Sequence, residues 1–164
     1  MRKLHVGPLV FRDPVLLCSG LYLLLYFDAS GFLRLGLLAA FLHEMGHICV
    51  YCLLQHRLPV IEVTMTGFCM RVRAGEVSSS QRFWLAAAGP GVNFLLAGLW
   101  ALRLTQTATV RGSAFWAANL LTGTFNLLPI LPLDGAQMLD SLAALLRQTQ
   151  KKRSEMIEKH RHLG

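Results

Sequence analysis

The chain has 164 residues, of which 54% are hydrophobic and only 15% are charged. The charged residues gather between long apolar stretches, so we expect one polytopic membrane domain. A net charge of +7 is common among nucleic-acid-binding proteins, but here the basic residues flank the apolar stretches, which excludes that class. The four cysteines lie mostly inside those stretches and do not indicate a disulfide scaffold.

Three apolar stretches near the beginning and middle of the chain are candidate membrane spans. Val15 to Phe27 is shorter than the roughly 20 residues that a helix needs to cross the hydrocarbon core. We expect this segment to tilt, to thin the bilayer locally, or to lie partly in the interface. Phe32 to Leu54 and Phe83 to Leu104 are each long enough to cross.

The second stretch contains His43-Glu44-Met45-Gly46-His47. On a helix His43 and His47 share one face, so both imidazoles can bind one Zn²⁺ ion. Glu44 lies beside that face and can accept a proton from an attacking water. The alternative is a helix whose histidines only bond to neighbouring spans, but ionisable groups at membrane depth are costly and usually functional.

Between the second and third spans, hydrophobic residues alternate with polar ones at Ile61, Val63 and Met65, and again from Phe68 onward. This period of two predicts two short strands joined at Thr66-Gly67. The hairpin edge could capture an extended substrate by strand addition, or the hairpin could simply lie along the membrane interface. The sequence leaves both interpretations open.

The last apolar stretch, Ser113 to Leu146, cannot be one straight membrane helix. Its 34 residues would be about 51 Å long as a helix, well beyond the bilayer core. Pro129 and Pro132 each lack an N–H and disfavour helix in the preceding residue. The prolines therefore predict an extended or kinked segment over Asn126 to Leu133.

Asp134 follows this break and begins a second helical stretch. Irregular backbone at membrane depth is tolerated only where it is buried in protein or lines a wet cavity. A carboxylate at that point is a candidate third zinc ligand. The carboxylate could instead cap the helix by accepting hydrogen bonds from the free backbone N–H groups of its first turn. The two roles could also coexist, with one oxygen on the metal and the other accepting a backbone bond.

The basic residues predict the orientation. Of the 16 Lys and Arg, 13 lie at the two termini or in the central loop, which four crossings place on one side. Arg34, Arg103 and Arg111 are the three on the other side. The positive-inside rule therefore predicts cytoplasmic termini. We expect residues 1–146 to form a single core and residues 147–164 a basic cytoplasmic tail. A solvated helix is the more ordinary interpretation of this tail, and a segment held near anionic headgroups is the other.

Three motifs in this chain resemble those of the site-2 proteases, which are intramembrane zinc metalloproteases. They are H-E-M-G-H at 43–47, G-P-G-V-N at 89–93 and N-L-L-P-I-L-P-L-D-G at 126–135. They occur in the family's order, and the resemblance covers about residues 15–146. One departure is Ala136, where many members carry a second glycine, and we expect it to be tolerated.

By position, the resemblance implies one zinc ion held by three ligands, His43, His47 and Asp134. It implies Glu44 as general base, with Asn93 and Asn126 near the substrate or the transition-state oxyanion. The implied fold is an all-α polytopic membrane protein with about four transmembrane segments and a short membrane-associated β-hairpin. The layout is similar to the compact bacterial branch that includes the sporulation proteases.

The expected function is therefore hydrolysis of peptide bonds within or near transmembrane segments, in a multi-pass protein of the bacterial cell membrane. Its expected partners are a membrane-protein or membrane-associated substrate, the lipid bilayer and a regulatory membrane protein. An alternative is a catalytically inactive relative that binds membrane segments as a chaperone or regulator. A transporter is a further alternative, but it would not need Glu44 beside the metal.

Overall fold

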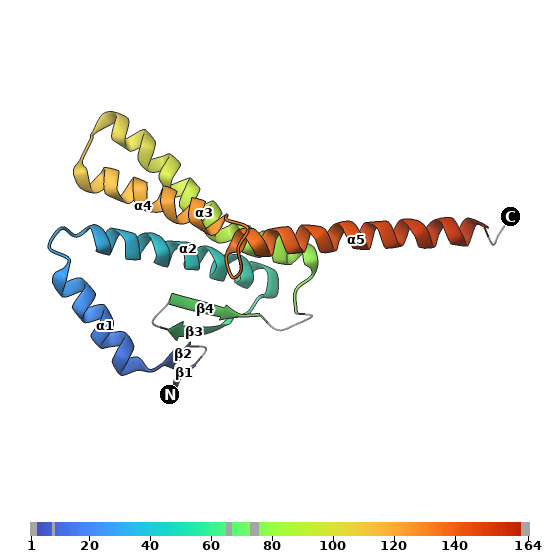
Figure 1. The fold of residues 1–164 in the computed structure, drawn as a ribbon, viewed down its shortest axis with the longest axis horizontal. Coiled ribbons are helices and arrows are strands. Elements are labelled where there is room, and N and C mark those ends of the chain that lie inside the picture. Colours follow the sequence, from blue (N-terminus) through green and yellow to red (C-terminus); the bar gives the residue numbers. More distant parts are fainter. Residues whose placement is uncertain (1–2, 8, 65–66, 73–75, 162–164) are drawn as a thin grey trace.

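The structure is a computed structural model that describes residues 3–7, 9–64, 67–72 and 76–161. Its helices and strands follow one another along the chain as β1 (Lys3–Val6), β2 (Leu9–Arg12), α1 (Pro14–Phe27), α2 (Phe32–Gln55), β3 (Val60–Thr64), β4 (Gly67–Arg71), α3 (Ser79–Gln106), α4 (Val110–Asn126) and α5 (Asp134–Arg161). The helices form the body of the molecule, and a small sheet lies beside α2 (Figure 1). The fold is thus mainly helical, as predicted.

The sheet has four strands in the order β1-β2-β3-β4. β3 and β4 pair antiparallel, with Ile61 opposite Met70, which confirms the predicted hairpin. The predicted turn includes Thr66, which lies outside the described residues. β1 and β2 were not predicted. β2 pairs parallel with β3, with Leu9 opposite Ile61, so the N-terminal segment extends the hairpin into a sheet.

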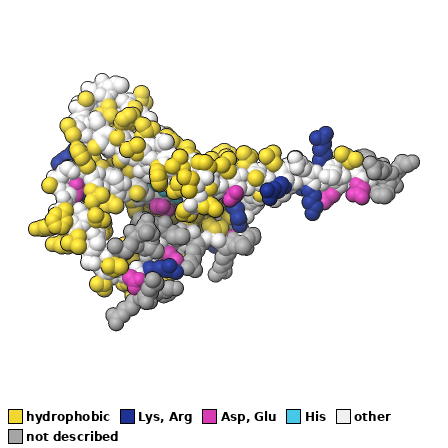
Figure 2. Space-filling view, in the orientation of Figure 1, with side chains coloured by type: hydrophobic (Ala, Val, Ile, Leu, Met, Phe, Trp, Pro, Cys, Tyr) yellow, Lys and Arg dark blue, Asp and Glu magenta, His cyan; other side chains and the backbone are white. Residues whose placement is uncertain are grey.

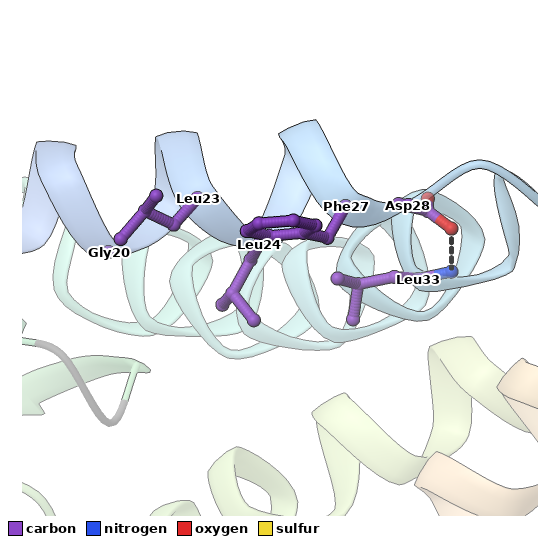
Figure 3. Close-up of a pocket in the computed structure, with 6 residues that line it drawn as sticks. All are labelled: Gly20, Leu23, Leu24, Phe27, Asp28 and Leu33. Atoms are coloured by element: carbon purple, nitrogen blue, oxygen red, sulfur yellow. Dashed lines mark hydrogen bonds between the residues drawn. The ribbon is translucent and has the colours of Figure 1, made fainter.

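α1 is an apolar helix that contributes no buried residue. Figure 1 shows it running between the sheet and the short connection to α2. An open apolar groove lies between α1 and the start of α2, lined in part by Leu23, Leu24 and Phe27 (Figure 3). The Asp28 carboxylate at the end of this groove accepts hydrogen bonds from the backbone N–H groups of Leu33 and Arg34. These bonds satisfy N–H groups in the first turn of α2, the helix that carries the histidines.

α3 is the central helix of the body, in contact with α2, α4 and α5. It begins with a capping box in which the Ser78 hydroxyl accepts from the Gln81 N–H and the Gln81 side chain accepts from the Ser78 N–H. Its buried face consists mainly of small side chains, among them Ala86, Gly89 and Ala97. Small side chains allow helix backbones to approach closely, as in membrane helix pairs.

The stretch Ser113 to Leu146 is divided as the prolines predict. α4 ends at Asn126 and α5 begins at Asp134, with seven non-helical residues between them. α5 then continues to Arg161, so the basic segment after Leu146 is part of the same helix. Side chains from 146 to 158 are exposed, and this half of α5 projects away from the body (Figure 1).

Within the described residues, two helices, α2 and α3, are long and apolar enough to cross a membrane, while α1 is apolar but shorter. Large hydrophobic side chains are exposed on their outer faces, including Leu95 and Leu102 of α3 and Val15 of α1. Figure 2 shows hydrophobic side chains spread over the helical body, with charged side chains along the projecting part of α5. Such a surface suits a lipid environment better than water.

Candidate metal centre

His43 and His47 lie one turn apart on the buried face of α2, and Asp134 is the first residue of α5. All three side chains are buried. Oδ2 of Asp134 lies 3.0 Å from Nε2 of His43 and 3.3 Å from Nε2 of His47. The two Nε2 atoms are 3.2 Å apart. The fold therefore brings together the three residues that the sequence analysis names as metal ligands.

Each imidazole is oriented by a hydrogen bond from its other nitrogen. Nδ1 of His47 lies 2.8 Å from the backbone carbonyl of Leu85, and Nδ1 of His43 lies 2.7 Å from Oδ1 of Asn93. Both partners are acceptors, so both Nδ1 atoms carry the hydrogen. In the neutral rings each Nε2 then presents a lone pair toward Asp134. Metal-binding histidines are usually held in this way by a carbonyl or carboxylate oxygen.

The three converging atoms need a cation. Two lone pairs and a carboxylate oxygen face one another, and Oδ2 of Asp134 is buried without a hydrogen-bond donor among the described residues. An isolated charge buried in this way is costly. Ligand atoms about 2.0 Å from a tetrahedral Zn²⁺ ion are about 3.3 Å apart, which matches the edges of this triangle. Two imidazoles and one carboxylate are a donor set found in catalytic zinc sites, where three protein ligands leave the fourth position to water or substrate.

Glu44 lies next to His43 on α2 and is half-buried. It is close enough to interact electrostatically with both histidines and with Asp134. A carboxylate in this position can take a proton from a water near the three ligands and later return it to a leaving amine.

The structure also locates the two asparagines. Asn93 of α3 is completely buried, and its amide contacts His43 and the backbone of α2. This position favours a role in orienting His43 over the substrate contact that the family resemblance implies. Asn126 is half-buried at the end of α4, and its side-chain N–H donates to the carbonyl of Thr122. It lies next to the non-helical segment that leads to Asp134.

Two glycines allow α2 and α3 to approach at the histidines. A Cβ atom on Gly46 would lie 2.8 Å from the carbonyl oxygen of Ala88, in the backbone of α3. A Cβ atom on Gly89 would overlap Nε2 of His47 and lie 2.6 Å from Nε2 of His43. Glycine at position 89 therefore leaves space for the ligands themselves.

We predict that Gly89→Ala weakens zinc binding by about tenfold or more. Tenfold is the lower end of the loss of metal affinity that is usual when the groups that orient a metal ligand are mutated. The added methyl group would displace one or both imidazoles from Asp134. Gly91→Ala is the matched control, because a Cβ atom at Gly91 meets nothing within 4 Å. Competition with a chelator of known affinity measures both. Equal affinities in the two variants would contradict the argument.

A third glycine shapes the start of α5. A Cβ atom on Gly135 would overlap the carbonyl of Leu127 and lie 2.7 Å from that of Leu128. The non-helical segment can therefore pack against the first turn of α5 only if residue 135 lacks a side chain. This packing holds Asp134 at the histidines. The next residue, Ala136, is buried in the same turn.

Two groups at this site were not predicted from the sequence. The first is the Leu85 carbonyl, which no residue pattern could identify because every residue has a carbonyl. The second is Asn119 of α4, which is completely buried and accepts a hydrogen bond from the Asn93 amide at 3.0 Å. A polar amide within an apolar stretch is a signal for contact between membrane helices, and it was available in the sequence.

No family model matches the sequence, and no curated protein matches it. The structure is similar to that of the site-2 protease from Methanocaldococcus jannaschii, with a TM-score of 0.60 and 20% sequence identity. The similarity covers 87% of this chain and 71% of the archaeal chain. The resemblance indicated by the three motifs is thus confirmed at the level of the fold, and this chain folds as a site-2 protease does.

Proposed function

We propose that the protein is an intramembrane zinc metalloprotease that hydrolyses peptide bonds within or near transmembrane segments. One observation carries the proposal: two imidazole nitrogens and a buried carboxylate oxygen converge beside Glu44 in a helical body with an apolar surface. The similarity to a site-2 protease supports it. Zinc, one ion per chain, would be held by His43, His47 and Asp134.

Bound zinc would lower the pKa of a water and polarise the scissile carbonyl. The protein's own groups would do the rest. Glu44 takes the proton of the attacking water and passes it to the leaving amine. Leu85 and Asn93 hold the imidazoles so that their Nε2 lone pairs stay directed at one point. The side chain of Asn126, beside the broken segment, is our candidate for an oxyanion contact.

The arrangement of the helices supports the proposed topology. The short connections at 28–31 and 107–109 lie at one end of the body, while the sheet and the projecting part of α5 lie toward the other (Figure 1). Most Lys and Arg lie at the termini and in the segment between α2 and α3, which includes the hairpin, and not in the two short connections. We propose a multi-pass protein of the bacterial cell membrane with cytoplasmic termini.

The substrate proposed here is a membrane-inserted or membrane-associated segment that can unwind, because a regular helix hides its carbonyls. β4 is an edge strand of the sheet, so its outer backbone groups could pair with such a segment. A regulatory membrane protein that restrains the activity is a further proposed partner.

The test of the proposed function uses the full chain in liposomes with a set of labelled single-span peptides. We expect cleavage by the untreated protein, no cleavage after removal of metal by a chelator, and recovery on addition of Zn²⁺ but not of Mg²⁺. Mg²⁺ prefers an octahedral shell of oxygen ligands and would not substitute at a site with two imidazoles. Cleavage that persists after the metal has been removed would refute a metalloprotease.

A further inference from the structure

We propose that Asn119 of α4 is a positioning residue for the metal centre, acting on the zinc ligand His43 through Asn93. This inference rests on the proposed function, because it assumes that His43 binds a metal. It adds a third helix to the machinery, since α4 itself carries none of the three ligands. Residue 119 lies outside all three sequence motifs.

A continuous chain of hydrogen bonds connects α4 to the imidazole. The Asn119 side-chain N–H donates to the carbonyl of Phe115 at 2.9 Å, and Oδ1 of Asn119 accepts from Nδ2 of Asn93 at 3.0 Å. Nδ2 of Asn93 also donates to the carbonyl of Ala39 at 3.2 Å. Oδ1 of Asn93 accepts from Nδ1 of His43 at 2.7 Å. The bonds therefore connect α4, α3 and α2.

The chain has a single direction. The Phe115 carbonyl can only accept, so the Asn119 amide turns its N–H groups to that carbonyl and its oxygen to Asn93. Asn93 in turn directs both hydrogens of Nδ2 at acceptors, on Ala39 and Asn119, and its oxygen at His43. His43 then has to carry its hydrogen on Nδ1, which leaves the Nε2 lone pair facing Asp134.

Burial makes this arrangement sensitive to the loss of one member. Asn93 and Asn119 both have a relative exposure of 0%, so water cannot replace a missing partner. Without the Asn119 oxygen, one hydrogen of Asn93 would be buried without an acceptor, which favours rotation of that amide. Rotation would withdraw the Asn93 oxygen from His43 and release the constraint on its tautomer.

A role limited to helix packing predicts something different. Phe115 packs its ring against Trp100 across the same α3–α4 contact, with centroids 4.7 Å apart. Phe115→Leu would loosen this contact while keeping the Phe115 backbone carbonyl and both amides. If Asn119 only holds the helices together, Phe115→Leu and Asn119→Leu would affect the metal centre alike.

The experiment compares zinc affinity in the detergent-solubilised full chain by chelator competition. We expect Asn93→Leu and Asn119→Leu each to weaken zinc binding by about 10- to 100-fold, the usual cost of losing a ligand's hydrogen-bond partner. Phe115→Leu should keep the affinity of the unmodified protein. Asn119→Asp keeps an acceptor oxygen toward Asn93 and should bind zinc much more tightly than Asn119→Leu. Asn119→Ala replaces Asn119→Leu in the comparison if leucine prevents folding.

The double variant Asn93→Leu/Asn119→Leu tests whether Asn119 acts through Asn93. If it does, Asn119→Leu weakens zinc binding no further once Asn93 is absent; independent effects would multiply instead. Multiplied effects, an unchanged affinity in Asn119→Leu, or an equal loss in Phe115→Leu would each overturn the inference.

A second measurement reads the His43 tautomer without metal. In protein with ¹⁵N-labelled histidine, we expect the hydrogen of His43 on Nδ1 in the unmodified chain and Asn119→Asp, and a mixture of tautomers in Asn119→Leu. An unmodified protein that binds no zinc would refute the proposed function, and with it the role of Asn119 in zinc binding. Zinc binding that is the same with and without Asn119 would refute only the present inference.

Discussion

Glu44→Gln is expected to reduce the rate of peptide hydrolysis by about 10²- to 10⁴-fold, the usual contribution of a general acid–base group. Glutamine has nearly the same shape but cannot accept the proton of the attacking water. Glu44 is not one of the three converging ligands, so zinc content should stay at that of the unmodified protein. Cleavage of a single-span peptide in liposomes and elemental analysis of the same preparation measure the two effects.

Glu155→Gln is the matched control, because Glu155 is exposed on the projecting part of α5. It should cleave at the rate of the unmodified protein. The outcomes also separate the alternative functions. Cleavage retained in Glu44→Gln would remove Glu44 as the general base. An unmodified protein that binds zinc and membrane segments but cleaves no peptide would favour an inactive relative with a chaperone or regulatory role.

Asp134→Ala and His43→Ala are each expected to lower bound zinc from about one ion per chain to a small fraction of that, because each removes one of three ligands. The two residues are on different helices and meet only in the folded chain. A loss in both variants would therefore show that α2 and α5 build one site. Elemental analysis of the purified detergent-solubilised protein measures it.

Two further variants serve as controls for this loss. Asp140→Ala removes an exposed carboxylate from the same helix as Asp134, and His56→Ala removes an exposed imidazole just after α2. Both should keep the zinc content of the unmodified protein. Zinc retained in Asp134→Ala would contradict the assignment of Asp134 as a ligand. Zinc lost in all four variants would indicate a folding defect instead.

The features that the sequence predicts correctly are those set by neighbouring residues. The positions of His43 and His47 on one face follow from the helical repeat within α2. The break after Asn126 follows from the backbone chemistry of Pro129 and Pro132. The pairing of β3 with β4 follows from an alternation that spans a short turn.

The features that were missed depend on contacts between distant segments. β1 and β2 have four residues each, too few for a clear alternation, and β2 gains its parallel partner from a strand about fifty residues later in the chain. A solvated helix was one interpretation of the basic tail, and the tail is helical as far as Arg161. Its continuity with the helix that begins at Asp134 was not predicted, because the boundary at Leu146 marks where apolar side chains end, while the helix continues in exposed, charged residues.

The sequence by itself therefore determined which candidate groups this protein carries: the side chains proposed to bind a metal, the carboxylate proposed as a base, and the point where the last apolar stretch breaks. Only the tertiary structure decided which atoms orient those groups. The Leu85 carbonyl, the Asn93 amide and the Asn119 amide reach their positions through the rotation and close approach of α2, α3 and α4. Helical periodicity places a side chain on a face, but the neighbour that meets this face is set by packing between helices far apart in the chain.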